Sequence, residues 1–317
     1  MNASTNVPPS GPAAATSTTR LGGRLLRLLA TLVVASSVMP RLHADDAPPS
    51  RVDALFDLEV ADKYLTPRGM IVADHGVTFQ ALFLAFVNVY KGAPGDFIND
   101  VGLVPGFWND YTTDPIAKHL GKTTYTDWVE IDPIMGVSVD FAKNFKLDVT
   151  YTEFGMQILD IGTSQQLETK LSYNDSDLLG ALALHPFVSY WKELKGKATA
   201  AANFGVPDSY YFDAGIDPGC SVGAVKIETP ISVLLPSSEF YGEPFAKHST
   251  VGLWEAGVKA TMPATFMPAG YGHWSVHAGV NYMDFVDKNL QQESIAGGFG
   301  PGKKDATQIY IGMSTFF

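Results

Sequence analysis

The last twelve residues, 306–317 (ATQIYIGMSTFF), constrain the fold of this chain more than any other segment. Apolar side chains occupy one set of alternating positions: Ile309, Ile311, Met313 and Phe317. Small or polar residues occupy positions between them: Gln308, Gly312 and Ser314. Because the side chains of a β-strand alternate between its two faces, this pattern predicts a strand with one apolar face and one polar face.

An apolar strand face is compatible with lipid only where the strand's backbone hydrogen bonds are all made within the protein, which requires closure into a barrel. The segment ends on the aromatic Phe317, which is typical of the last strand of a Gram-negative outer-membrane barrel. We therefore expect an all-β fold, an antiparallel transmembrane β-barrel in the bacterial outer membrane. The apolar set should face lipid, and the polar set should face the interior. Tyr310 and Phe316 share the inward positions, so they should make the interior narrower there.

Most of the chain has the composition of β-strands. The pattern predicts about twelve of them, a number within the known range of barrels. They are expected near residues 54–64, 76–90, 101–110, 126–141, 145–159, 165–175, 179–191, 209–217, 222–235, 250–262, 272–285 and 306–317. Alternation of apolar and polar residues is clearest over 145–152, 166–173, 254–262 and 273–282. The apolar run 76–90 is interpreted as a strand because it is rich in β-branched and aromatic residues.

Alternation also fits a β-sandwich, and the lengths of the connections favour the barrel. In outer-membrane barrels, short turns at one end alternate with long loops at the other. Short turns are expected at 142–144, 175–178 and 218–221. Long connections are expected at 112–125, 192–208, 236–249 and 286–305.

Large aromatic residues lie near many predicted strand ends, where an interfacial girdle would use them. They are Trp108, Trp128, Trp191, Trp254, Trp274, Tyr64, Tyr90, Tyr151, Tyr190 and Tyr282. An ordinary aromatic core is the alternative interpretation.

The N-terminal segment is interpreted as a cleaved secretory signal peptide, residues 1–44. A basic region with three arginines precedes the apolar run 28–38, which is too short to span a bilayer. Residues 42–44 offer a cleavage site with a small terminal residue. Residues 45–53 are then a short periplasmic lead, and 54–317 the outer-membrane β-barrel. An uncleaved anchor or a core helix is the alternative for the apolar run.

Charge and cysteine content argue against several classes of function. Four of the 22 basic residues and none of the 33 acidic residues lie in 1–44, so the mature chain has a net charge of about −15. Nucleic acid is not expected as a partner, because its binding requires basic patches. Cys220 is the single cysteine, so the chain cannot form an internal disulfide. Phosphate-loop, zinc-ligand and nucleophile motifs are missing, so we expect no cofactor, no metal and no enzymatic activity.

The polar faces of the predicted strands indicate a charged interior. A basic side chain facing lipid near the midplane costs about 2–4 kcal/mol, whereas charges inside a barrel can pair across strands. The residues expected to line the lumen are Glu130, Asp140, Asp148, Glu168, Lys170, Asp213, Glu228, Glu255, Lys259, His273, His277 and Asn281. Acidic residues outnumber basic ones, so a conducting lumen would favour cations or hydrogen-bonding neutral solutes. A lumen closed by salt-bridged side chains is the alternative.

His273, Ser275 and His277 share one face of a predicted strand. Serine and histidine are components of hydrolases, but neighbours on one strand face lie about 7 Å apart. That spacing is poor for the Ser–His hydrogen bond of nucleophilic catalysis. We interpret the three residues as part of a hydrated interior that could bind a metal, titrate or simply fill space.

Six short phrases are similar to uncharacterised Gram-negative outer-membrane proteins of this size, including the family labelled Gcw-chp. They are 64–69 (YLTPRG), 171–176 (LSYNDS), 185–187 (HPF), 191–194 (WKEL), 211–216 (YFDAGI) and 271–274 (YGHW). The predicted architecture also resembles the twelve-stranded nucleoside channels of the Tsx type. The resemblance implies a barrel over most of 54–317, and it implies no catalytic or ligand-binding residue.

The sequence thus leads to an outer-membrane barrel that is a channel or binding pore for small hydrophilic solutes. A non-conducting structural or adhesive barrel, acting through long extracellular loops, is the alternative, and a lipid-modifying enzyme is a third and weaker one. The expected partners are outer-membrane lipid, small solutes, and the barrel-assembly machinery acting on the C-terminal strand that ends at Phe317.

Overall fold

The computed structural model describes residues 52–114, 127–157, 163–195, 209–241, 249–267, 272–295 and 302–317. All of them belong to one unit, Ser50–Phe317. The predicted signal peptide, 1–44, and nearly all of the predicted lead lie outside the described residues. Within the described ranges, no helix is both long enough and apolar enough to cross a membrane.

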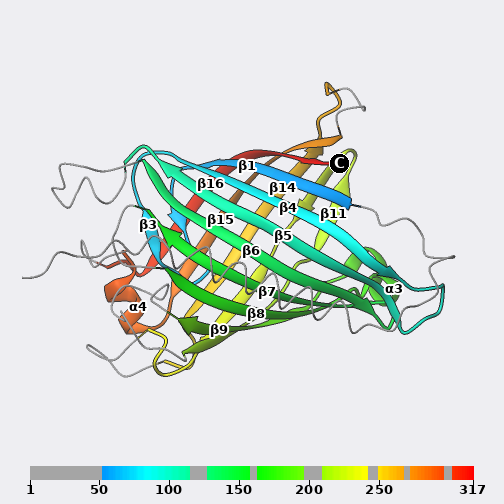
Figure 1. Cartoon of the computed structure of the whole chain (residues 1–317). Coiled ribbons are helices and arrows are strands. Elements are labelled where there is room, and N and C mark those ends of the chain that lie inside the picture. Colours follow the sequence, from blue (N-terminus) through cyan, green and yellow to red (C-terminus); the bar gives the residue numbers. More distant parts are fainter. Residues whose placement is uncertain are drawn as a thin grey trace, which may run out of the picture. The chain divides into compact units, whose positions relative to one another are not determined.

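Among the described residues, twelve antiparallel strands form the wall of a closed β-barrel (Figure 1). In chain order they are β1 (Val52–Ala61), β4 (Thr78–Lys91), β5 (Ile98–Thr112), β6 (Trp128–Phe141), β7 (Phe145–Met156), β8 (Ser164–Tyr173), β9 (Phe187–Lys195), β10 (Tyr210–Ile216), β13 (Ile231–Pro236), β14 (Leu253–Pro263), β15 (His273–Phe285) and β16 (Asp305–Phe316). Strand β16 pairs with both β15 and β1, which closes the cylinder. The predicted all-β fold, an antiparallel barrel of about twelve strands, is confirmed.

Two further strands lengthen one hairpin of the wall. β11 (Gly219–Val222) pairs with β12 (Val225–Glu228), and β12 pairs with β14 alongside β13. The turn predicted at 218–221 is therefore wrong, because the chain stays extended to Val222 and reverses at Gly223. Gly223 has a φ of +61°, which glycine adopts at no steric cost. The proline in the predicted turn interrupts the strand without reversing it.

The connection between β8 and β9 is longer than expected. Residues Ser176–Leu179 form the short helix α3, and Gly180–Leu182 form the 3-10 turn η1. The predicted tight turn at 175–178 and the predicted start of a strand at 179 are both wrong, since β9 begins at Phe187. The leucine-rich composition of this segment predicts a strand, but the segment forms helical turns with exposed side chains. By contrast, the turn predicted at 142–144 is confirmed.

The outer face of the wall is apolar. On β16 the exposed fractions alternate as the sequence predicts: Ile309 and Ile311 are each 61% exposed, whereas Gln308 is 6% and Tyr310 is 8% exposed. Apolar residues of the other strands are also exposed on this face: Leu58, Phe79, Phe107, Val137, Val188, Phe212, Ile231, Trp254, Val258 and Val280. An exposed apolar surface that many strands share marks a face that lies against lipid or protein.

The aromatic residues only partly follow the expected girdle. Trp108 and Tyr64 pack against each other, with ring centroids 5.1 Å apart, and Trp191 packs against a buried core cluster. These three belong to the interior, so their assignment to a girdle is wrong. A row of stacked or tilted rings lines one end of the barrel, but its members lie outside the predicted set: Phe97, Phe141, Phe145 and Tyr173.

The two ends of the barrel differ. Helix α4 (Lys288–Glu293) and strand β3 (Ile71–Ala73) lie at one end, and α3 and the end of the chain lie at the other (Figure 1). We call these the loop end and the termini end.

Candidate functional site

The connection between β1 and β4 enters the barrel. Strands β2 (Tyr64–Leu65) and β3 form a small hairpin in it. Of residues 64–73, which we call the hairpin plug, all but Pro67 are buried. A surface loop would expose its backbone and side chains to water, so this burial shows that the segment is enclosed by the barrel wall.

The turn of the hairpin plug is encoded locally. Gly69 N donates to Thr66 O at 2.9 Å, and Met70 N donates to Thr66 Oγ1 at 3.1 Å. Proline at the second position and glycine at the fourth are favoured in type I turns, and Pro67 and Gly69 occupy them. Gly69 has a φ of +84°, and a Cβ there would lie 2.8 Å from Leu253 Cδ2. Both the backbone and the surrounding space therefore require glycine.

The hairpin plug packs against two different parts of the wall. One buried cluster joins Leu65 and Ile71 to β10, β13, β14, β15, β16 and α4 through Tyr211, Leu234, Leu253, Met283, Phe285, Ala306 and Leu290. Phe240 and Tyr241, which follow β13, belong to the same cluster. A second cluster joins Tyr64, Met70, Val72 and Ala73 to Val129 of β6, with Trp108 of β5 against it. Because β5 and β6 lie far round the sheet from β13 and β14, the hairpin plug bridges the lumen at this level.

Polar contacts hold the tip of the hairpin plug. Arg68 Nη1 donates to Gln166 Oε1 at 2.8 Å, and the Arg68 guanidinium lies 4.6 Å from the centre of the Phe154 ring. Gln166 Nε2 in turn donates to Glu193 Oε1. Tyr241 Oη donates to the Arg68 carbonyl at 2.8 Å. A buried charge is costly unless it is hydrogen-bonded. Gln166 of β8 supplies the acceptor for Arg68, and Glu193 of β9 holds Gln166 in place.

The rest of the hairpin plug is bonded to other strands. Gln308 Nε2 of β16 donates to the Lys63 carbonyl at 2.8 Å, next to the base of the hairpin. Tyr64 Oη donates to Glu130 Oε2 of β6 at 2.7 Å. Ile71 N donates to the Ser294 carbonyl at 2.6 Å, just after α4. In the predicted long connection 286–305, the described part up to Ile295 contains helix α4 and contacts the hairpin plug.

Acidic side chains lie behind the hairpin plug. Asp110 is fully buried, and Glu130 and Asp132 are 4% and 3% exposed. A register shift between β5 and β6 places one extra residue, Val129, on β6, and such a bulge changes the direction of the side chains around it. Both Val129 and Glu130 consequently meet the hairpin plug.

A second buried group surrounds His277. Its Nε2 atom lies 3.6 Å from Asp57 Oδ1 and 3.7 Å from Glu59 Oε2, both on β1. Gly312 makes room for the ring, because a Cβ there would lie 2.3 Å from His277 Nε2. Ser275, two residues away on β15, instead shares a 2.8 Å hydrogen bond with Ser314. Within the described residues, Ser275 and His277 thus have separate partners, and no group of histidine, cysteine or acidic side chains has metal-binding geometry.

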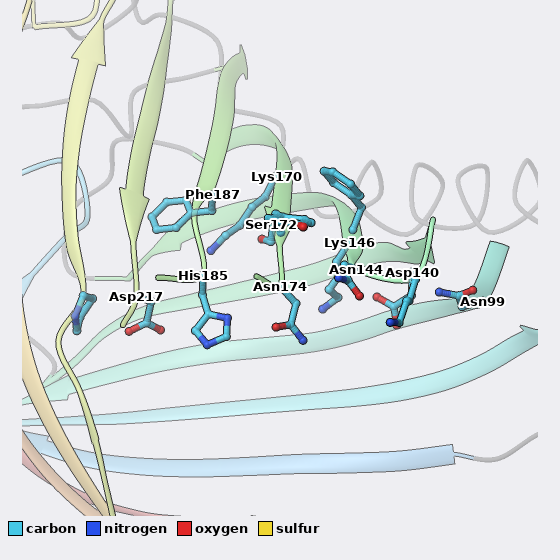
Figure 2. A pocket seen from close by; sticks show the side chains of 14 residues that line it. Asn99, Asp140, Asn144, Lys146, Lys170, Ser172, Asn174, His185, Phe187 and Asp217 are labelled. Atoms are coloured by element: carbon cyan, nitrogen blue, oxygen red, sulfur yellow. The ribbon is translucent and has the colours of Figure 1, made fainter. Parts of the chain in front are cut away.

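A cavity of about 720 Å³ lies at the termini end. Figure 2 shows side chains from β6, β7, β8 and β9 around it. The lining residues are Asn99, Asp140, Lys143, Asn144, Phe145, Lys146, Lys170, Ser172, Tyr173, Asn174, His185, Phe187, Asp217 and Pro230. Its volume falls in the range of small-molecule sites, about 300–1,000 Å³.

The side chain of Asp175 shapes one edge of this cavity. Its Oδ1 atom accepts hydrogen bonds from the backbone amides of Leu184, at 3.1 Å, and His185, at 2.9 Å. Desolvation raises the pKa of the Asp175 carboxyl, but these amide hydrogen bonds outweigh it and lower the pKa below the usual value. The bonds also hold His185 at a φ of +47°, a region uncommon for residues other than glycine.

The structure distributes the predicted lumen residues over several places. Glu130 lies behind the hairpin plug, and Asp140 and Lys170 line the cavity. Asp148 pairs with the cavity residue Lys146 at 3.2 Å, and Glu168 accepts from Ser189. The others occupy strand positions whose side chains face the interior: Asp213, Glu228, Glu255, Lys259, His277 and Asn281. His273, at the start of β15, is exposed at the termini end.

Five residues that make the main interior contacts are not among the predicted lumen residues. Arg68, Gln166 and Glu193 form the tip network, and Asp57 and Glu59 face His277. The alternation Leu55, Asp57, Glu59 against Phe56, Leu58, Val60 was a readable signal for β1. The Thr66–Gly69 turn was also readable, but nothing local indicates that the turn points into a lumen.

No family model matches the chain, and no curated protein matches it. Solved structures of barrels do resemble it. An outer-membrane channel from Pseudomonas putida F1 is 11% identical, with a TM-score of 0.45, over 88% of this chain and 100% of that one. The translocator domain of the autotransporter NalP from Neisseria meningitidis is 12% identical, with a TM-score of 0.41, over 94% and 97%.

Outer membrane phospholipase A from Escherichia coli is 10% identical, with a TM-score of 0.40, over 85% of this chain and 94% of that one. These three proteins are a channel, a translocator and an enzyme. Structural similarity to them therefore does not favour one function over another. The resemblance to Gcw-chp and Tsx-type proteins stays a prediction. Over the residues that the structure describes, the topology of the strands is that of a closed twelve-stranded antiparallel β-barrel.

Proposed function

We propose that the protein is a bacterial outer-membrane barrel that binds small hydrophilic solutes in its lumen and passes them when the hairpin plug moves. The apolar outer face supports the location, because lipid is the environment in which such a face is favourable. In this proposal the termini end faces the periplasm and the loop end faces the outside.

The observation that carries the proposal is the cavity at the termini end, whose lining includes several charged side chains. Eight-stranded barrels are filled by side chains, whereas this wall of twelve strands leaves about 720 Å³ beside Lys170 and Asp140. A barrel that served only to present loops would not require a cavity of this size lined by charged residues. The hairpin plug then acts as a closure on the opposite side.

One observation favours a second candidate, a non-conducting barrel that acts through its outer loops. The hairpin plug is fully packed on both faces, and the fully buried Leu290 of α4 covers it. A permanently sealed lumen would have the same contacts. Conductance separates the two candidates.

The test is ion conductance across planar bilayers. Wild-type protein is compared with a variant in which residues 64–73 are replaced by a short glycine–serine linker. A matched control replaces 92–97, the connection between β4 and β5, in the same way. We expect little conductance from the wild type and the control, and a stable open channel from the plug variant. A plug variant that folds, inserts and still does not conduct would contradict the channel and favour the loop-acting barrel.

A further inference from the structure

We propose that the cavity at the termini end binds a small zwitterion of the α-amino-acid class, with Lys170 holding its carboxylate and Asp217 holding its ammonium group. The inference rests on the proposed function, since it names the solute class of the same cavity.

Lys170 is the cation available to a ligand. Its Nζ atom lies 4.4 Å from the centre of the Phe187 ring, an arrangement that attracts a cation without neutralising it. In the described part of the chain, no carboxylate lies within ion-pair distance of it. The other two lysines of the cavity are paired: Lys143 lies 2.6 Å from Asp177, and Lys146 lies 3.2 Å from Asp148.

The fold positions the Phe187 ring that supports Lys170. Phe187 pairs with Gly215 of β10, and a Cβ on Gly215 would lie 2.9 Å from Phe187 Cε1. The aromatic ring thus lies across the glycine of the neighbouring strand. This contact turns the ring towards the cavity, and Figure 2 shows Lys170 and Phe187 next to each other.

Asp217 is the matching anion. It follows β10, and its backbone N donates to the Leu184 carbonyl at 2.8 Å, which fixes its position. Its Oδ1 atom is buried and accepts no hydrogen bond within the described structure. Because an unpaired buried carboxylate oxygen is unfavourable, an ammonium group of a ligand would supply the missing donor. Figure 2 places Asp217 beside His185 at the margin of the cavity.

The surroundings favour a zwitterion over a singly charged solute. Glu168, Asp213 and Asp217 all interact electrostatically with Lys170. A simple anion would be repelled by these three carboxylates, and a simple cation would leave Lys170 without a partner. A molecule with both charges offers a favourable partner to each side, and Asn144, Asn174 and Ser172 supply hydrogen bonds around it.

The experiment is isothermal titration calorimetry of the detergent-solubilised full barrel with three probes: L-alanine, propionate and ethylammonium. We expect L-alanine to bind at least tenfold more tightly than either singly charged probe. Lys170→Met and Asp217→Asn should each weaken L-alanine binding at least tenfold, and Lys170→Arg should retain it. The charge-matched controls Lys288→Met, on α4, and Asp305→Asn, at the start of β16, should leave it unchanged.

Equal binding of propionate and L-alanine would overturn the proposal in favour of an anion site, and equal binding of ethylammonium would overturn it in favour of a cation site. Absence of binding for all three probes would also overturn it. The probe comparison uses the wild-type protein, so it holds even where a variant fails to fold. Planar-bilayer conductance of the plug variant is a separate measurement, so a conducting barrel that binds no zwitterion loses only this inference.

Discussion

Arg68 Nη1 donates a 2.8 Å hydrogen bond to Gln166 Oε1, across a sequence separation of 98 residues. The bond joins the tip of the hairpin plug to strand β8, and Gln166 passes the contact on to Glu193. These contacts connect the hairpin plug to the wall. We expect mutations in them to have the largest effect on how firmly the plug is held.

Arg68→Ala should release the tip of the hairpin plug. Removing the guanidinium leaves the buried Gln166 Oε1 without its donor, and the loss of a hydrogen bond to a charged group typically costs about 1.5–3 kcal/mol. We expect lower resistance to denaturant and higher conductance in planar bilayers. Lys63→Ala is the control, because it removes a half-exposed pair with Asp62 at the base of the hairpin. Unchanged stability and conductance in Arg68→Ala would show that the tip network does not hold the plug.

Gly69→Ala should disturb the same plug through the backbone. The new Cβ would meet Leu253 at 2.8 Å, in a conformation with a φ of +84°. Gly95 is a matched control, because its φ is +98° but nothing lies within 4 Å of the added Cβ. Both variants carry the strain of a positive φ, about 1 kcal/mol, and only Gly69→Ala adds a steric clash. Chemical denaturation should therefore separate the two, and equal loss of stability would argue against tight packing of the plug.

Asp175 should make the β8–β9 connection sensitive to acid. Amide hydrogen bonds lower the pKa of its carboxyl relative to the unfolded chain, so its contribution to stability is present above the unfolded value, about 3.9. That contribution is lost as the pH falls through the lower folded-state pKa. Hydrogen exchange at the Leu184 and His185 amides should be slow at pH 5 and accelerate below about pH 4, relative to intrinsic rates. In Asp175→Asn the protection should be weaker and nearly independent of pH, and a wild-type pH profile in this variant would contradict the assignment.

Neighbouring residues of β7 should respond in opposite ways to a lysine. Val149 pairs with Val137, which is 40% exposed on the outer face, whereas Thr150 pairs with Glu168. Val149→Lys should destabilise the barrel in lipid by about 2–4 kcal/mol. Thr150→Lys places the charge inside, next to Glu168, and should be much milder. Denaturant titration in lipid vesicles measures both, and equal effects would argue against the inside–outside assignment of this strand.

The strands were largely predictable because their signal is local. A two-residue alternation such as that of 306–317 depends only on which face meets an apolar medium, and Ile309 and Gln308 differ accordingly in exposure. The predictions are wrong where the same residue composition is compatible with two kinds of secondary structure. The leucine-rich residues after Asp175 form helical turns, and the segment after Ile216 stays extended past a proline.

The candidate sites likewise have features that local sequence predicts and features that it does not. The sequence by itself determined the strands, the apolar outer face and the charged inner parity that includes Glu130, Asp140 and Lys170. Only the tertiary structure decided that 64–73 enters the lumen, because its partners, among them Gln166 and Tyr241, lie about 100 to 170 residues away in the chain. The physical reason is that periodicity encodes the direction of a side chain relative to its own strand. Which residues meet inside a barrel depends instead on closure, which brings distant strands to face each other across the lumen.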